Sequence, residues 1–204
     1  MVFPWDDSRR AFRDGALWFV GMAALVGERW DRPGLGEWDV RALVGHTSRS
    51  LLTVEAYLAR PAPAAELPSP ADYFRATRAV AAGPAVAARG REAGAALGAD
   101  PAAAVAEIAD RVLALLARCD GTELVTTVAG GMRLADYLPT RTFELAVHTA
   151  DLAAALGLPL DVPETSAAQA LCVVADLAVA DGHSGALLLA TTGRSGLPAG
   201  FSVF

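Results

Sequence analysis

The stretch "DPAAAVAEIADRVLALLARCDG", residues 100–121, carries the clearest helix signals in the chain and limits the folds open to it. Asp100 is a suitable N-cap, Pro101 fits the first helical position, and Gly121 follows the end. One apolar face is predicted by the residues that recur at helical spacing: Val105, Ile108, Val112 and Leu115. A helix with one apolar face must bury that face against other elements.

Three further segments carry the signals of amphipathic helices. The first runs from about Asp7 to Trp30, the second starts after the N-cap Asp39 and stops before Pro61, and the third covers 139–157. In this third helix the proline at its start fits the first turn, and the glycine at its end fits the C-cap. Four such helices predict an all-α fold, an antiparallel four-helix bundle.

The connecting segments are rich in proline and glycine. Residues 31–38 are expected to form a loop, and residues 61–70 a long connector. The alanine-rich stretch that follows favours helix, with a break near Gly83-Pro84. Residues 123–138 could form two short strands around a Gly-Gly pair, or an extended segment that leads into the next helix. The sequence therefore leaves room for one short β-hairpin at most.

The C-terminal part of the chain predicts one more helix, near Glu164 to Ala180, followed by a short tail. Too few residues remain there to build a separate core. We therefore expect residues 1–160 to form the helical bundle. Residues 161–204, the extra helix and its tail, are expected to pack on the bundle rather than form an independent domain.

Composition and charge exclude several classes of function. The 204 residues are 53% hydrophobic, and the formal net charge of −6 comes with scattered arginines, which argues against a nucleic-acid partner. The apolar stretch 15–27 has acidic flanks and is too short to span a membrane. Cys119 and Cys172 lack metal-binding spacing, which predicts free thiols in a reducing compartment. We expect a cytoplasmic protein without membrane or nucleic-acid partners.

A polar stripe runs along the helix predicted at 139–157. Its members follow one another at steps of three, four and three: Arg141, Glu144, His148 and Asp151. Arg141 and His148 share the spacing of the core-facing leucines, so both lie in or beside the buried seam. Charged groups at such a position are costly unless they are paired or bind a metal. The stripe therefore predicts a partner.

Glu144 and His148 have the spacing that lets one carboxylate and one imidazole meet on a single ion. His46, on the second predicted helix, could face them across the bundle and complete a site of two histidines and one carboxylate. Such a set suits zinc and leaves one coordination position open. Spacing alone leaves an alternative open, in which Glu144 and His148 form a surface pair and His46 is a core histidine. His183 lies in a glycine-flanked loop and is expected to be ordinary.

Two blocks together resemble a known family. They are "WDRPGLGEWDVRALVGH" (30–46) and "RTFELAVHTADLAAALG" (141–157). In content and order they are similar to the N-terminal domain of the mycothiol-dependent maleylpyruvate isomerases, in the DinB-like metal-binding superfamily. The resemblance implies a four-helix bundle whose metal, usually zinc, is held by His46, Glu144 and His148. It also implies that the metal activates a low-molecular-weight thiol, mycothiol, whose sulfur adds to a substrate double bond.

The resemblance suggests roles for the rest of the stripe. Arg141 is predicted to orient a carboxylate of the substrate or thiol through two parallel hydrogen bonds; the alternative is a salt bridge to Asp151 or Glu144. Asp151 could accept the second N–H of His148. Neither cysteine is placed by its surroundings to be the nucleophile, so the sulfur would come from an external thiol. The isomerases also carry a separate C-terminal domain, whereas only a short segment follows residue 157 here, which puts maleylpyruvate isomerisation itself in doubt.

Four hypotheses about function follow. The leading hypothesis is a zinc-dependent isomerase or transferase that uses a small thiol such as mycothiol on a small electrophile. The alternatives are a non-catalytic structural or sensory metal-binding bundle, a metal-dependent hydrolase, and a helical interaction protein without metal. The sequence also leaves open whether the protein forms a homodimer through its alanine-rich helix faces.

Overall fold

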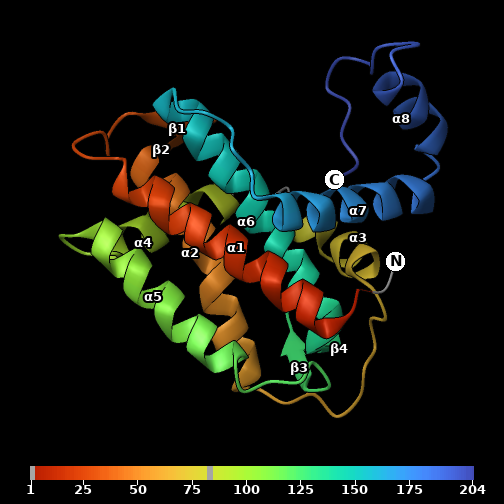
Figure 1. Cartoon of the computed structure of the whole chain (residues 1–204), viewed down its shortest axis with the longest axis horizontal. Coiled ribbons are helices and arrows are strands. Elements are labelled where there is room, and N and C mark those ends of the chain that lie inside the picture. The colour runs from red at the N-terminus through yellow and green to blue at the C-terminus, as the bar shows by residue number, and fades with distance from the viewer. Residues whose placement is uncertain (1–2, 82–84) are drawn as a thin grey trace.

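The computed structural model describes residues 3–81 and 85–204, and within them the protein is almost entirely helical (Figure 1). Four helices form the bundle: α1 (Trp5–Ala24), α2 (Val40–Leu58), α5 (Pro101–Leu116) and α6 (Leu134–Leu156). Both α1 and α2 pack against α5 on one side and α6 on the other. The predicted all-α four-helix bundle is confirmed.

The first helix ends earlier than predicted, at Ala24 rather than near Trp30. Gly27 has φ +60°, a left-handed conformation that a helix cannot contain. Arg29 then caps the broken end, since its Nε donates to the carbonyl of Val26 at 3.0 Å and its Nη1 to that of Leu156 at 3.1 Å. One side chain thus ties the end of α1 to the end of α6.

The segment predicted as a loop, residues 31–38, contains short strands. β1 (Pro33–Leu35) pairs antiparallel with β2 (Trp38–Asp39) just before α2. The backbone N–H groups of Val40 and Arg41 donate to the carbonyls of Arg32 and Trp30, so this ribbon is fastened to the start of the helix. The prediction missed it because strands this short leave no alternating pattern.

The predicted start of α2 is confirmed, because Asp39 Oδ1 accepts from the backbone N–H of Ala42 at 2.7 Å. After the 61–70 connector come α3 (Pro70–Ala81) and α4 (Ala85–Ala96). Gly83 and Pro84, where a break is predicted, lie outside the described residues. α4 packs closely on α2 where two glycines meet, since a Cβ on Gly45 would lie 2.1 Å from the backbone nitrogen of Gly94.

The caps predicted for α5 are confirmed: the Asp100 side chain accepts from Ala103 N at 3.0 Å, and Pro101 opens the helix. Its apolar face differs at two positions. Val105 and Val112 are fully buried as predicted, but Ile108 and Leu115 are only half-buried, and Ala109 and Leu116 are buried instead. The helix stops at Leu116, and the chain turns toward the β-hairpin from there.

The strand option for residues 123–138 is confirmed, as β3 (Leu124–Thr127) pairs antiparallel with β4 (Gly130–Arg133). α6 begins directly after β4, so Pro139 lies inside the helix instead of in its first turn. A residue outside the helix fixes where α6 begins, since Leu134 N donates to Glu123 O at 2.7 Å. Full burial of Leu134 and Tyr137 offsets the hydrogen bond that proline cannot make.

Beyond the bundle, α7 (Glu164–Ala180) occupies its predicted position and packs on α1 and α6. The predicted tail is wrong in part, because α8 (Ser184–Thr191) forms there, although none of its residues is buried. α8 lies beyond α7, away from the bundle (Figure 1). The division of the chain near residue 160 stays a prediction. None of the helices in the described ranges is long and apolar enough to cross a bilayer.

We expect Gly45→Ala to destabilise the protein by about 1–3 kcal/mol, because the added methyl group meets the backbone of α4. The matched control is Gly21→Ala at an exposed position of α1, where a Cβ meets nothing within 4 Å. This change should stabilise the protein by about 0.5–1 kcal/mol. Urea unfolding measures both, and equal effects of the two substitutions would contradict the close α2–α4 contact.

Candidate metal centre

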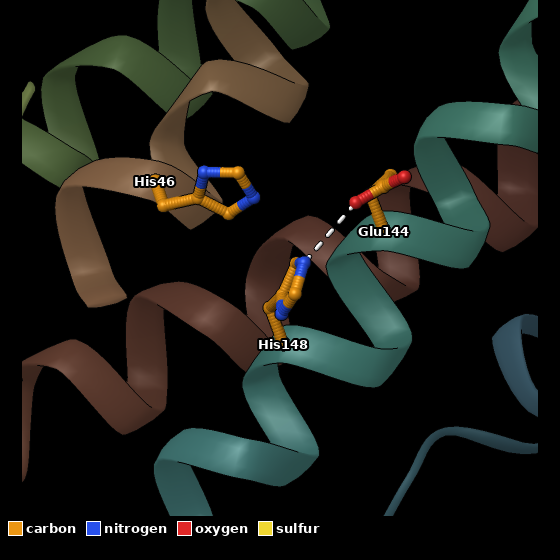
Figure 2. A group of neighbouring side chains, drawn as sticks. All are labelled: His46, Glu144 and His148. Atoms are coloured by element: carbon orange, nitrogen blue, oxygen red, sulfur yellow. Dashed lines mark ion pairs between the residues drawn. The ribbon is translucent and has the colours of Figure 1, made fainter. Parts of the chain in front are cut away.

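Three side chains that the sequence predicts as ligands meet where α2 packs on α6. His46 comes from α2, and Glu144 and His148 come from successive turns of α6 (Figure 2). One ligand atom from each lies within 4.8 Å of those of the other two. The Nε2 atom of His148 is 3.2 Å from Oε2 of Glu144. The fold therefore brings together residues that are about a hundred positions apart in the chain.

The ring of His46 is held between two other rings. The indole of Trp38 lies 4.4 Å from it, centroid to centroid, and the ring of His148 meets it edge-on at 4.7 Å. The indole N–H of Trp38 donates to the carbonyl of Ala87 on α4 at 3.0 Å, which fixes the indole in turn. Figure 2 shows one ring nitrogen of His46 pointing toward Glu144 and His148. Its orientation is thus set before any ligand arrives.

The charges of the cluster are strongly coupled. Burial lowers the pKa of His46 to about 4, and the charge of His148 acts in the same direction, so this ring is neutral at pH 7. Burial alone would raise the pKa of Glu144, but the hydrogen bond from His148 and the charge of Arg141 hold it at about 2. Burial alone would lower the pKa of His148, but its hydrogen bonds to Asp151 and Glu144 raise it to about 9. One positive charge is therefore held between two carboxylates.

Asp151 provides the contact predicted for it. Its Oδ2 lies 3.1 Å from Nδ1 of His148, while Nε2 of the same ring faces Glu144. A carboxylate in this position fixes the orientation of a ligand histidine and raises its basicity. His46 lacks the equivalent support, since its Nδ1 is buried with no hydrogen-bond partner in the described part of the chain.

The donor set fits a divalent cation that accepts nitrogen and oxygen ligands. Ligands of tetrahedral zinc lie about 2.0–2.2 Å from the ion and hence roughly 3.4 Å from one another. Glu144 and His148 already have nearly this separation, and the nearest ring nitrogen of His46 lies within 4.8 Å of both. Three protein ligands would leave a fourth position open.

A cavity of about 590 Å³ opens beside the cluster, a volume typical of small-molecule sites. Its wall includes six aromatic side chains: Trp38, Tyr57, Tyr73, Phe74, Phe143 and Phe204. Three arginines also line it, namely Arg49, Arg89 and Arg141. Among the described residues, Glu144 is the only acidic side chain on the wall. The candidate ligands thus border a space that a small molecule could fill.

Arg141 is buried in this wall with only 8% of its surface exposed. Its guanidinium carbon lies 5.2 Å from the ring centroid of Tyr73 and 5.1 Å from that of Tyr137. Its Nε donates to Thr140 Oγ1 at 2.9 Å. Within residues 3–81 and 85–204, no carboxylate lies within ion-pair distance of it. The alternative of a salt bridge to Asp151 or Glu144 is therefore wrong.

Sequence patterns did not reveal several residues at and behind the pocket wall. Tyr137 is fully buried behind the wall, against Arg141. It lies four residues before Arg141, and this spacing could have placed it on the same helix face. Tyr73 and Phe204 come from α3 and from the last position of the sequence. No local pattern connects either of them to the metal-type residues.

Comparison with known proteins identifies the family. The family model described as the mycothiol maleylpyruvate isomerase N-terminal domain matches residues 18–153, well over half of the chain. The matched range contains all three residues of the cluster. No curated protein and no solved structure matches the chain significantly.

We expect purified, untagged protein to bind one equivalent of divalent metal and His46→Ala and His148→Ala to lose it, because each removes one of three ligands. His183→Ala is the matched control, since this histidine lies outside the cluster. Elemental analysis gives the metal content, and circular dichroism checks the fold. A folded wild-type protein that takes up no divalent cation would make the cluster an ordinary ion pair.

Asp151→Asn should weaken metal binding about 10- to 100-fold, because the amide no longer supports His148 as a carboxylate does. Asp161→Asn, in the exposed loop before α7, should leave the affinity unchanged. Competition with a chromophoric chelator measures both. Equal affinities in the two variants would show that Asp151 does not act on the site.

Proposed function

The chain belongs to the DinB-like family of mycothiol maleylpyruvate isomerase N-terminal domains, and from this premise we propose that it is a zinc-dependent enzyme that uses a small thiol. Its thiol is of the mycothiol type, and its substrate is a small electrophile that it isomerises or joins to the thiol. The observation that carries the proposal is the cluster of two histidines and one glutamate beside a 590 Å³ cavity.

The number of protein ligands favours a catalytic over a structural role for the metal. Structural zinc sites are closed by four protein ligands, whereas catalytic sites have three and keep one position for a small molecule. Among the described residues the cluster has three candidate ligands, and the side chains of Glu144 and His148 keep 22% and 16% of their surface exposed. A small molecule could therefore reach the cluster through the cavity.

In this proposal the side chains of α2 and α6 hold the metal ion and orient its ligands. His46, Glu144 and His148 bind the ion, and Asp151 keeps the His148 ring turned toward it. When bound, zinc would supply a positive charge that favours thiolate over thiol, and the thiolate is the nucleophilic form. The aromatic side chains of the wall offer apolar contacts to the body of a small molecule beside the ion.

The sulfur comes from outside the protein. Neither Cys119 nor Cys172 lines the cavity. Burial raises the pKa of Cys119 to about 11, so its thiol is a weak nucleophile at neutral pH. Neither cysteine forms a disulfide, which agrees with a reducing, cytoplasmic setting. An external thiol such as mycothiol is therefore the source that fits the pocket.

Arg141 is proposed to orient the reacting partners. It lies one turn before Glu144 on α6, and Tyr73 and Tyr137 hold its guanidinium in place. A planar guanidinium can give a carboxylate two parallel hydrogen bonds. Since no protein carboxylate occupies it among the described residues, its donors remain available to a ligand. Dimerisation through the alanine-rich helix faces stays a prediction.

The proposal predicts direct binding of the thiol at the metal. Protein loaded with Co²⁺ and titrated with mycothiol should develop an absorption band from sulfur-to-cobalt charge transfer. The same thiol with its sulfur methylated should give no band, and cobalt-loaded His183→Ala should behave like wild type. Metal-loaded protein that develops no band with mycothiol would remove the thiol from the mechanism and favour the non-catalytic or hydrolytic alternatives.

A further inference from the structure

Three phenylalanines form one wall of the cavity, and the last of them belongs to the C-terminal tail. Phe204 stacks on Phe143 of α6, with centroids 4.5 Å apart and rings 23° from parallel. Phe74 of α3 meets both rings nearly edge-on, at 5.0 Å from Phe204 and 5.3 Å from Phe143. Phe74 and Phe143 are buried, but Phe204 keeps 43% of its surface exposed. An aromatic surface is thus presented at the cavity.

The tail that carries this ring is fastened to the body of the protein. Val203 is buried, and its carbonyl accepts from Arg78 Nη2 at 3.2 Å. Arg78 is itself paired with Asp181 at the end of α7. Phe201 meets the ring of His183 edge-on at 5.5 Å. The position of Phe204 is therefore held by contacts of its tail with α3 and with the connection between α7 and α8.

The same cavity is cationic although the protein is acidic. The chain has a formal net charge of −6, but three arginines and one acidic side chain line this space. None of Arg49, Arg89 and Arg141 has a carboxylate within ion-pair distance in the part of the chain that is described. Arg141 is also more than nine-tenths buried. A buried cation without a counter-ion is costly, so the cavity favours an anionic occupant.

We propose that the cavity takes a small aromatic acid, with its carboxylate on Arg141 and its ring against Phe204 and Phe143, and that Phe204 determines this specificity. The inference rests on the proposed function, because it names the substrate class of the same site. A ring that packs against these phenylalanines gains about 2- to 12-fold in affinity over a saturated body of similar size. An uncharged ring would leave Arg141 unpaired.

Benzoate is the probe, and its binding to metal-free and zinc-loaded protein is measured by titration calorimetry. Cyclohexanecarboxylate keeps the charge without the aromatic ring, and benzamide keeps the ring without the charge. Wild-type protein should bind benzoate more tightly than either, in both metal states. Zinc would also attract a carboxylate. The titrations of metal-free protein therefore measure the contribution of Arg141 to benzoate binding without that of the ion.

Phe204→Leu should lower the affinity for benzoate to that for cyclohexanecarboxylate, while the affinity for cyclohexanecarboxylate stays the same. Leu197→Ala is the control, since it shortens an exposed apolar side chain of the same tail outside the cavity wall, and it should leave benzoate binding intact. Arg141→Lys should weaken benzoate and leave benzamide unchanged, because lysine cannot make two parallel hydrogen bonds. Thermal unfolding of each variant checks that the fold is retained.

Two results would overturn the inference: equal affinity of wild type for benzoate and cyclohexanecarboxylate, or unchanged benzoate binding in Phe204→Leu. Its failure differs from failure of the proposed function. Protein that loads zinc and binds mycothiol but does not prefer benzoate keeps the thiol chemistry and loses the aromatic substrate. Protein that prefers benzoate but binds no metal keeps the aromatic anion pocket and loses the metal chemistry.

Discussion

The burial of charged side chains at the contact between α2 and α6 is the constraint on which the site depends. Leu138, Leu145 and Leu152 recur every seven residues along α6 and are fully buried. Each contributes about 1.5–3 kcal/mol of transfer free energy. The burial of these three leucines offsets the free-energy cost of placing Glu144 and His148 at the edge of the core. The hydrophobic packing therefore fixes the geometry, and the charged cluster follows from it.

The other half of the site depends on how closely α2 and α4 approach. Glycines at positions 45 and 94 let the two backbones touch. That approach brings the carbonyl of Ala87 within reach of the indole of Trp38, and the indole then packs on His46. The orientation of one candidate ligand is thus set by a helix that contributes no ligand itself. Such indirect support is what a preorganised site requires.

Local signals predicted most of the helices and the three candidate ligands, because these features depend on short stretches of sequence. The caps at Asp39, Asp100 and Gly157 each act within one turn of their own helix. The errors arose where distant segments decide. α6 starts before its proline because the backbone of Glu123 binds Leu134, and α1 ends early where Arg29 reaches the far end of α6. No pattern in a single helix could reveal either contact.

The positive charge of the cavity also could not be predicted from local sequence patterns. A net charge of −6 and scattered arginines argue against a nucleic-acid partner, yet they say nothing about one concave region. Arg49, Arg89 and Arg141 come from α2, α4 and α6, and they converge only when these helices pack. Inside such a concave space charges act more strongly on a ligand than they do in open water. Three positive charges there weigh more for ligand choice than the excess of acidic residues on the surface.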